Sequence, residues 1–226
     1  IIHLAGAGIG DKRWSKKRKK LIAESREIPT RHLANTLASL EHPPSLFMCS
    51  SAVGFYDNRG DEELDENSSI GDGFLATICK KWEDATQPAT DAGIRTIRMR
   101  TGIVTTAAGG MLQQILLPAK LGAMGPLGGG RQWQSWISLD DQIYAIHYLM
   151  NHDDASGVVN LTAPNPVTQK QFAKTLGKVL RRPAFAPAPG FVMKILFGEM
   201  GKSLILDGQK VHPQRLLDFG YKFEHE

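Results

Sequence analysis

The strongest constraint on the fold is a regular alternation between short apolar segments and longer segments with helical periodicity. Apolar runs occupy residues 1–5, 45–50, 94–104 and 158–161, and helical patterns lie between them. Apolar runs of this length that end at turn-forming residues are typical of buried strands. Strands that alternate with helices form a parallel sheet covered by helices. The sequence therefore predicts an α/β fold.

The helical segments are less uniform than the strands. They are expected at residues 15–40, 74–92, 111–121, 140–150 and 168–181. Pro29 should kink or divide the first of these helices, because proline removes a backbone donor and crowds the preceding turn. Thr168 and Gln171 have the spacing of a capping box at a helix start. From Pro183 the chain becomes proline-rich and then apolar, which predicts a separate C-terminal lobe.

Three loops are the places to search for a ligand site. Residues 6–10, 50–56 and 101–107 each follow a predicted strand. In parallel α/β sheets, ligands bind beyond the carboxyl ends of the strands. These loops are therefore expected to lie together around one site.

Charge and composition narrow the class of protein. The chain has 226 residues and a net charge of +4, and its basic residues concentrate in the segment Lys12–Lys20. Two cysteines, Cys49 and Cys79, give no disulfide framework, which favours a cytoplasmic protein. No apolar window is long enough to span a membrane, so a membrane partner is not expected. The basic segment is interpreted as a solvated helix start, with nucleic-acid or other polyanion binding as the minority interpretation.

Several short motifs occur in a characteristic order along the whole chain. They are residues 3–6, 11–14, 25–26, 51–56, 100–104, 125–133, 136–141, 161–166 and 208–213. Together they resemble the epimerase-like proteins of the atypical extended short-chain dehydrogenase/reductase type, some of which are called cell-division-inhibitor homologues. Each motif alone is weak, and the ordered set is specific.

This resemblance implies a Rossmann-like parallel sheet with a small, mostly helical C-terminal substrate lobe. Residues 1–163 would form the remainder of an NADP-binding domain, with 106–137 contributing to the substrate lobe, and 164–226 the small C-terminal domain. The family begins with a strand and a glycine-rich turn that holds the cofactor pyrophosphate. Residues 6–10 do not match that turn. We therefore interpret the sequence as lacking the N-terminal part of the sheet.

The resemblance also implies which residues contact NADP. They are Leu4, Ala5, Gly6, Arg26, Thr101, Gly102 and Val104. Arg26 stands where related dehydrogenases have an asparagine, and its guanidinium could hold a phosphate or ribose oxygen. Without the resemblance, Arg26 would be interpreted as a surface salt-bridge residue and Val104 as a plain strand end.

The catalytic group of this family is incomplete in the sequence. Short-chain dehydrogenases use a serine with a Tyr-x-x-x-Lys pair, whose lysine lowers the pKa of the tyrosine. Ser51 occupies the serine position, but the helix that begins at Phe74 carries no tyrosine. Ser51 and Tyr56 are the catalytic candidates that remain. The scattered histidines predict no metal site.

Three functions follow from these patterns. The leading one is an NADP-dependent oxidoreductase or epimerase-like enzyme that acts on a small sugar-like or nucleotide-sugar substrate. The alternatives are a non-catalytic NADP-binding protein with a degenerate active site, and polyanion or nucleic-acid binding through residues 12–20. Whether the chain is an enzyme is left open by the missing tyrosine and lysine, and a homodimer is also left open.

Overall fold

The computed structural model describes residues 1–184 and 188–226. Its centre is a four-stranded sheet in the order β1-β2-β4-β8, and all its pairings are parallel. The strands are β1 (Ile2–His3), β2 (Leu46–Ala52), β4 (Arg95–Thr101) and β8 (Gly157–Leu161). The predicted α/β class with a parallel sheet is thereby confirmed.

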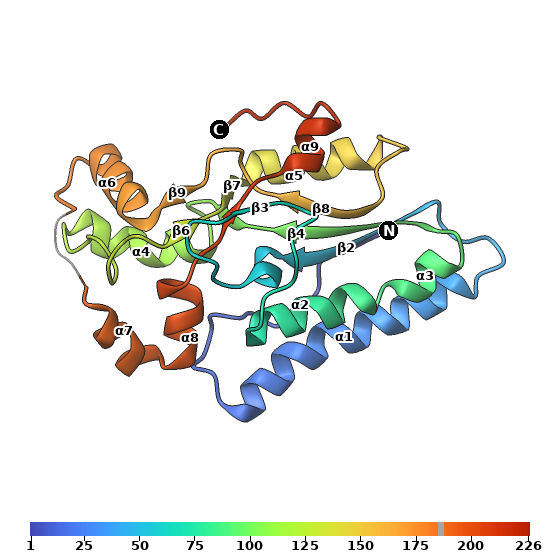
Figure 1. Cartoon of the computed structure of the whole chain (residues 1–226), viewed down its shortest axis with the longest axis horizontal. Helices are drawn as coiled ribbons and strands as arrows, with labels where there is room; N and C mark the ends of the chain where they lie inside the picture. Colours follow the sequence, from blue (N-terminus) through green and yellow to red (C-terminus); the bar gives the residue numbers. More distant parts are fainter. Residues whose placement is uncertain (185–187) are drawn as a thin grey trace.

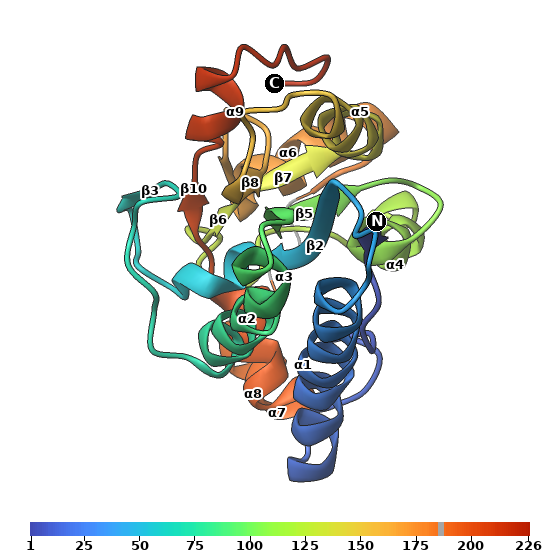
Figure 2. The ribbon, with the colours of Figure 1, turned by 90° about the vertical axis from the view of Figure 1, so that its right-hand side faces the viewer.

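Helices cover both faces of this sheet (Figure 1). On one face lie α1 (Lys16–Ala38), α2 (Phe74–Asp84) and α3 (Gln87–Asp91). On the other face lie α5 (Leu139–Met150) and α9 (Gln214–Asp218). Figure 2 shows the two layers on either side of the strands.

The alternation of side chains along β2 explains how both layers are held. Phe47 and Cys49 pack with Trp82 in the core under α1 to α3. Met48 packs with Leu149 in the core under α5. Successive side chains of a strand point to opposite faces, so a continuous apolar run serves two cores at once.

Two of the predicted helices differ from the structure in informative ways. Pro29 lies inside the continuous helix α1, so the expected division does not occur; Ile22 and Thr30 are buried on either side of the proline. The helix expected over 74–92 is instead two helices, α2 and α3. The break coincides with Pro88, which has no backbone N–H to continue the ladder.

The third predicted strand also divides. After β4 the chain passes through Gly102 and leaves the main sheet as β5 (Ile103–Thr105). There it pairs in parallel with β7 (Trp136–Ser138). This departure at the carboxyl edge of the sheet opens space beyond β2 and β4.

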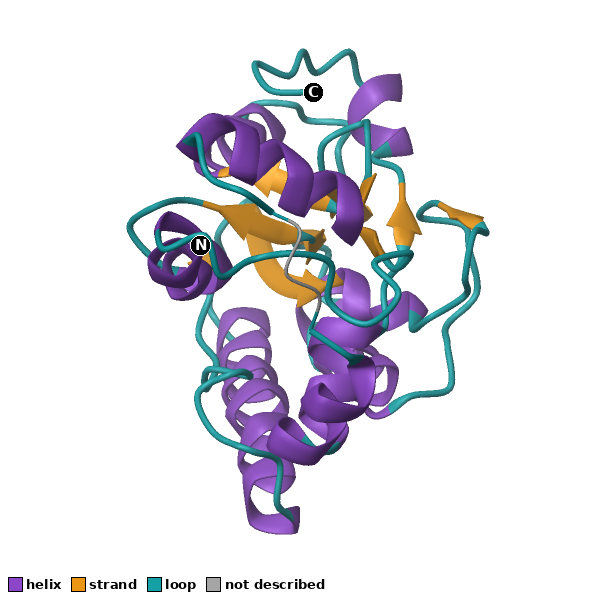
Figure 3. Cartoon of the chain, turned by 90° about the vertical axis from the view of Figure 1, so that its left-hand side faces the viewer, coloured by secondary structure: helices purple, strands orange, loops and turns teal. Residues whose placement is uncertain are grey.

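The remaining elements lie mostly beyond that edge. They are β3 (Glu63–Leu64), the 3-10 turn η1 (Val53–Tyr56), α4 (Gly110–Lys120), β6 (Trp133–Gln134), β9 (Val167–Thr168), α6 (Gln169–Leu180), α7 (Gly190–Phe197), α8 (Glu199–Gly201), η2 (Lys202–Leu206) and β10 (Lys210–Val211). Figure 3 views the molecule from the side on which α4, α6 and α7 lie. The capping box of α6 is confirmed, with Thr168 and Gln171 bonding reciprocally.

The C-terminal segment does not all stay with these helices. Leu216 and Tyr221 belong to the core cluster on the α5 face of the main sheet. The proposed division at residues 163 and 164 stays a prediction. The structure adds that the last part of the chain packs on the sheet of the first part.

Candidate functional site

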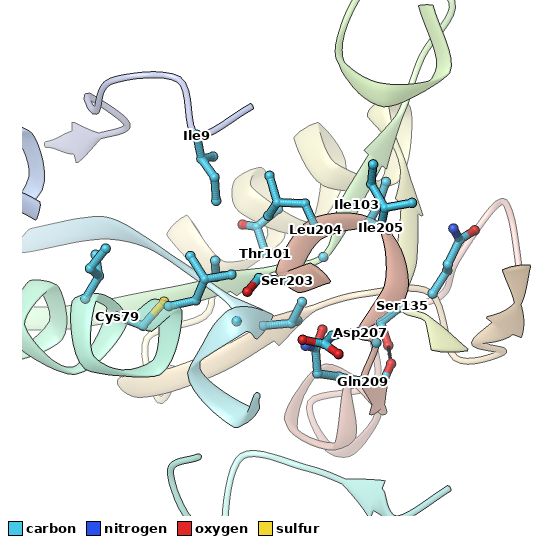
Figure 4. A pocket seen from close by; sticks show the side chains of 18 of the residues that line it. Ile9, Cys79, Thr101, Ile103, Ser135, Ser203, Leu204, Ile205, Asp207 and Gln209 are labelled. Carbon is cyan, nitrogen blue, oxygen red and sulfur yellow. Dashed lines mark hydrogen bonds between the residues drawn. The ribbon is translucent and has the colours of Figure 1, made fainter. Parts of the chain in front are cut away.

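A pocket of about 300 Å³ lies beyond the carboxyl ends of β2 and β4. Its walls come from the loops after the strands, from α2, from β6 and from residues 203–209. Figure 4 shows these side chains converging on one space. The expectation that residues 6–10, 50–56 and 101–107 gather around one site is confirmed, because Ile9, Ala52 and Thr101 all line it.

Small residues shape the floor of the pocket. Ala52 is the last residue of β2, Gly54 lies just beyond it in η1, and Gly102 follows β4. A Cβ at Gly102 would lie 2.4 Å from the carbonyl oxygen of Ser135, so no larger residue fits. The backbone of this floor is therefore open to close approach by a flat ligand.

Helix α2 presents an apolar wall to the pocket. Leu75, Ile78, Cys79 and Trp82 line it, at the spacing of one helix face. Burial raises the pKa of the Cys79 thiol to about 12, so this side chain is a neutral group at neutral pH. None of these four side chains is therefore a proton donor or acceptor suited to neutral pH.

Phe74, the first residue of α2, does not line the pocket. The ring of Phe74 packs edge-on against Trp14, with 5.0 Å between centroids. Two pairs of α2 residues that line the pocket have the spacing of Tyr-x-x-x-Lys, namely Leu75 with Cys79 and Ile78 with Trp82. Neither pair contains a tyrosine or a lysine.

Arg26 on α1 supplies the one positive charge among the residues that line the pocket. Its Nη1 donates to the carbonyls of Ala7 at 3.0 Å and Ile22 at 3.1 Å. Its guanidinium lies 5.0 Å from the Trp82 ring centroid. A Cβ at Gly6 would lie 3.1 Å from Arg26 Cζ, so the predicted cofactor residues Gly6 and Arg26 are neighbours.

The other predicted cofactor residues are distributed unevenly. Thr101 and Gly102 line the pocket. Leu4 is 60% exposed at the end of the edge strand β1, and Ala5 is exposed beside it. Val104 packs against the core on the α5 side. Leu4, Ala5 and Val104 do not line this pocket, and their contacts with a cofactor stay predictions.

The two catalytic candidates lie beneath the floor of the pocket, in one buried hydrogen-bonded cluster. Ser51 Oγ donates to Glu83 Oε1 at 2.6 Å. Arg100 binds the Glu83 carboxylate through Nε and Nη2, each at 2.8 Å. Tyr56 is fully buried, accepts from Arg100 Nη1 at 3.0 Å and donates to Asn160 Oδ1 at 2.7 Å.

The protonation of Tyr56 follows from this environment. Burial raises the pKa of the phenol to about 12, even though Arg100 favours the ionised form. Neither Ser51 nor Tyr56 is among the residues that line the pocket. Their catalytic roles stay predictions, and the observed geometry gives both hydroxyls a part in holding the strand ends.

The wall opposite α2 consists of residues that the sequence had not singled out as a site. Ser203, Leu204, Asp207 and Gln209 line it. Asp207 Oδ2 lies 2.7 Å from Lys202 Nζ. The sequence signal for this wall was Gly208, which begins one of the ordered motifs. A Cβ at this position would lie 2.1 Å from the carbonyl oxygen of Trp133, so the position requires glycine. That close approach brings the C-terminal segment against β6.

The loop predicted to offer donors and aromatic faces is partly in the site. Trp133, Gln134 and Ser135 line the pocket. The Trp133 indole N–H is already bound to Asp61 at 2.7 Å. Gln134 Oε1 is buried and has no hydrogen-bond partner among the residues that the structure describes.

Two further observations concern metal binding, membrane insertion and nucleic-acid binding. Among the described residues there is no cluster of side chains that could hold a metal ion, and no helix long and apolar enough to cross a membrane. In the basic segment, Arg18 pairs with Asp11 and Lys19 with Glu199, which partly neutralises its charge. Nucleic-acid binding by this segment stays a prediction.

Comparison with known proteins gives consistent relatives. Residues 188–226 match a family described as a domain of unknown function, DUF1731. An epimerase family protein of Mycobacterium bovis is 38% identical over 225 residues, covering 100% of this chain and 74% of the relative. The mouse epimerase family protein SDR39U1 is 35% identical, covering 99% of this chain and 77% of its own length.

Solved structures show the same fold. The human epimerase family protein SDR39U1, crystallised with NADPH, superposes with a TM-score of 0.94 at 34% identity, over 99% of this chain and 76% of that one. MoeE5, solved with UDP-glucuronic acid and NAD, superposes with a TM-score of 0.77 at 16% identity, over 100% and 74%. The second likeness concerns the fold alone.

Proposed function

Because this chain belongs to the epimerase family of extended short-chain dehydrogenase-type proteins, we propose that it binds NADP at the pocket beyond β2 and β4. The observation that carries the proposal is the combination of a glycine- and alanine-lined floor with a guanidinium at its side. The NADPH-containing structure of human SDR39U1 supports the choice of cofactor. When bound, NADP supplies or accepts a hydride.

The residues fit the nicotinamide end of such a cofactor. The floor formed by Ala52, Gly54 and Gly102 and the apolar wall of α2 suit a flat ring. Two of the Arg26 nitrogens, Nε and Nη2, have no partner among the hydrogen bonds of the described residues, and could bind a phosphate or ribose oxygen. We propose that Gly6, Arg26, Thr101 and Gly102 make the cofactor contacts.

The leading function is an NADP-dependent oxidoreductase or epimerase-like activity on a small, hydroxyl-bearing, sugar-like substrate. The walls formed by β6 and residues 203–209 would hold that substrate against the cofactor end of the pocket. Polar groups on these walls would orient it. Residues 106–137 and 164–226 would then both contribute to substrate binding.

A second function is favoured by one specific observation. No α2 residue that lines the pocket is a tyrosine or a lysine, the two residues that exchange the proton accompanying hydride transfer in short-chain dehydrogenases. With no such pair on α2, the chain could bind NADP without the standard chemistry of the family. This supports a non-catalytic NADP-binding protein as the alternative.

Titration calorimetry with NADPH and NADH tests the cofactor assignment. Arg26→Gln should weaken NADPH binding at least about tenfold, because a charge-assisted hydrogen bond is lost. Arg31→Gln is the matched control, since Arg31 is exposed on the same helix and does not line this pocket. Equal affinity of the Arg26 and Arg31 variants, or no NADPH binding by the wild type, would reject the assignment.

The double variant Leu75→Tyr with Cys79→Lys separates the two functions. If only the proton-exchanging pair is missing, it should oxidise NADPH in the presence of an α-dicarbonyl such as diacetyl, where the wild type does not. Wild-type turnover of such a probe would instead favour an active enzyme that uses other groups. The double variant's NADPH affinity must be shown to match the wild type before rates are compared.

A further inference from the structure

Helix α7 exposes a group of large apolar side chains. None of its eight residues is buried, although most of them are apolar. Phe191, Ile195 and Leu196 are 65%, 68% and 56% exposed. Large apolar side chains that gather on one exposed helix mark a surface that contacts a protein or a membrane.

The opposite side of α7 holds the helix on the protein. Phe197 packs against the core cluster that contains Trp14. Helix α8 approaches the same side, because a Cβ on its last residue would lie 2.6 Å from the Met193 carbonyl oxygen. Phe191 and Ile195 are one turn apart and lie on the side of the helix that faces away from these contacts. The exposed apolar stripe therefore points outward from a helix that is fixed in place.

The basic segment 12–20 lies beside the end of α7. The guanidinium of Arg13 would lie 3.1 Å from a Cβ at Gly198, the residue that follows α7. Lys19 Nζ binds the Glu199 carboxylate at 2.7 Å. Figures 1 and 2 both show α7 and the start of α1 at the lower end of the molecule. Residues 12–20 and 191–196 therefore form one surface, which we call the α7 surface.

Much of the positive charge on the α7 surface is unpaired. The exposed basic residues that take part in no ion pair among the described residues are Lys12, Arg13, Lys16 and Lys17. The other basic side chains of the segment pair with carboxylates. Unpaired lysine and arginine beside exposed apolar side chains are the combination that binds anionic lipid headgroups and the acyl boundary beneath them.

Other occupants would use only part of this surface. A nucleic acid would use the basic side chains, but of the three exposed apolar side chains only Phe191 could stack on a base. In a symmetric dimer the same patch meets itself, so the unpaired basic residues of two copies would lie close together and repel one another. An anionic bilayer uses both the charge and the apolar stripe.

We propose that the α7 surface binds reversibly to a membrane surface that contains anionic lipids. The exposed apolar side chains of α7 enter the boundary between headgroups and acyl chains, and the four unpaired basic side chains lie against lipid phosphates. At eight residues, α7 is too short to cross a bilayer, so the contact is confined to the outer layer of the membrane.

Co-sedimentation with lipid vesicles tests the proposal. The probes are vesicles of phosphatidylcholine alone and vesicles that also contain about 30% phosphatidylglycerol, which supplies the negative surface potential. Binding to the anionic vesicles should be at least about a hundredfold tighter, since each basic side chain near the surface contributes about fivefold. It should weaken as the salt concentration rises. Equal binding to both kinds of vesicle, or no binding to the anionic ones, would overturn the proposal.

An apolar variant tests the role of α7 itself. Phe191→Ser with Ile195→Ser should weaken binding to anionic vesicles at least about tenfold, because two apolar side chains no longer leave water. The matched control is Ile143→Ser with Tyr144→Ser, which changes two exposed residues of α5 at the opposite end of the molecule. The control should bind as the wild type does. Equal binding by the two double variants would overturn the proposal.

A charge variant tests the basic segment. Lys16→Gln with Lys17→Gln should weaken binding to anionic vesicles at least about tenfold, at about fivefold for each side chain. Lys178→Gln with Lys222→Gln makes the same change of net charge at exposed residues outside the α7 surface, and should have little effect. Equal losses in the two variants would show an effect of net charge alone and would overturn the assignment to this surface.

Two further measurements separate the other occupants. If the α7 double variant bound a DNA duplex and anionic vesicles as tightly as the wild type does, the surface would bind polyanions in general and the proposal would be overturned. A dimer in sedimentation equilibrium that dissociates in the α7 double variant would instead assign the stripe to a second copy. Thermal unfolding followed by circular dichroism should be unchanged in every variant, because all the replaced side chains are exposed.

Discussion

The buried carboxylates of Glu83 and Asp141 are satisfied in different ways. Glu83, under the pocket, is bound by the Arg100 guanidinium through two hydrogen bonds and by Ser51. Asp141, at the start of α5, has mostly uncharged donors. It accepts from the Ser138 hydroxyl at 2.8 Å, the Glu224 N–H at 2.9 Å and the His225 N–H at 3.0 Å.

The two sets of partners show which structural elements each carboxylate links. The Glu83 cluster links α2 to β2 and β4, and therefore fixes the strand ends that form the pocket floor. The Asp141 cluster links α5 to the last residues of the chain, with Tyr221 also donating to it at 3.2 Å. Loss of a charge partner should cost more than loss of a neutral donor set, because an unpaired buried charge is left behind.

The largest effect is expected from Glu83→Gln. Arg100 is only 4% exposed, and it would keep its charge without a counterion. Removing one partner of a buried ion pair costs about 3–5 kcal/mol. Urea unfolding followed by circular dichroism measures this loss in the free energy of unfolding.

A surface pair provides the control for this comparison. Glu62→Gln breaks an ion pair with Arg59 in which the glutamate side chain is 49% exposed, and should cost about 0–1 kcal/mol. The double replacement Glu83→Leu with Arg100→Met should be less destabilising than Glu83→Gln alone, because no charge is left unpaired. A double variant that is worse than the single one would show that the charges themselves stabilise the fold.

Asp141→Asn should have the second largest effect. The amide keeps one acceptor oxygen but turns its nitrogen towards donors, so several charge-assisted hydrogen bonds weaken at once, at a cost of about 1.5–3 kcal/mol. The released C-terminal segment should then be cleaved sooner in limited proteolysis. If Asp141→Asn lowered the free energy of unfolding more than Glu83→Gln, the prediction that loss of a charged partner costs more than loss of neutral donors would be wrong.

The same carboxylate predicts a pH dependence. Burial alone would raise the pKa of Asp141, but hydrogen bonds from Glu224, Ser138 and His225 outweigh it and hold the pKa below its ordinary value. Its stabilisation is therefore complete above the unfolded pKa of about 3.9 and is lost as the pH falls from there through the lower folded pKa. The stability difference between wild type and Asp141→Asn should shrink over that acid range.

Tyr56→Phe should have a smaller effect within the cluster under the pocket. It removes the hydroxyl that joins Arg100 to Asn160, and leaves each with one buried group short of a partner, at a cost of about 1–2 kcal/mol. NADPH affinity should be unchanged, because Tyr56 does not line the pocket. A large fall in NADPH affinity without loss of stability would instead place the phenol at the ligand.

The sequence was sufficient to predict the sheet and the loops that surround the site. A continuous apolar run such as 45–50 indicates a strand that is buried on both faces of the sheet. The loops that follow such parallel strands meet at one edge of the sheet. It was insufficient where a contact joins distant segments. The pairing of Glu83 with Arg100, and the return of residues 203–209 to the pocket, leave no periodic signal in the chain.

The predicted catalytic residues illustrate the same limit at finer scale. Ser51 is at the end of a predicted strand, and sequence alone cannot tell which face of the strand its hydroxyl takes. The structure directs that hydroxyl to Glu83 and gives the pocket Ala52 instead. Likewise, Leu75 lines the pocket and its neighbour Phe74 does not, because neighbouring residues of a helix point about 100° apart.

The smallest effect is expected from Ser51→Ala, and it tests the catalytic prediction most directly. Glu83 keeps both hydrogen bonds from Arg100, so the loss of one hydroxyl donor should cost about 0.5–1.5 kcal/mol. Thermal unfolding and NADPH titration of the same preparation measure the two consequences together. A small loss of stability with unchanged NADPH affinity fits a residue that positions the pocket floor. If NADPH-dependent turnover of any substrate fell a hundredfold in Ser51→Ala while its stability stayed intact, the hydroxyl would have to reach the pocket. Ser51 would then belong to the pocket lining and not only to the buried cluster beneath it.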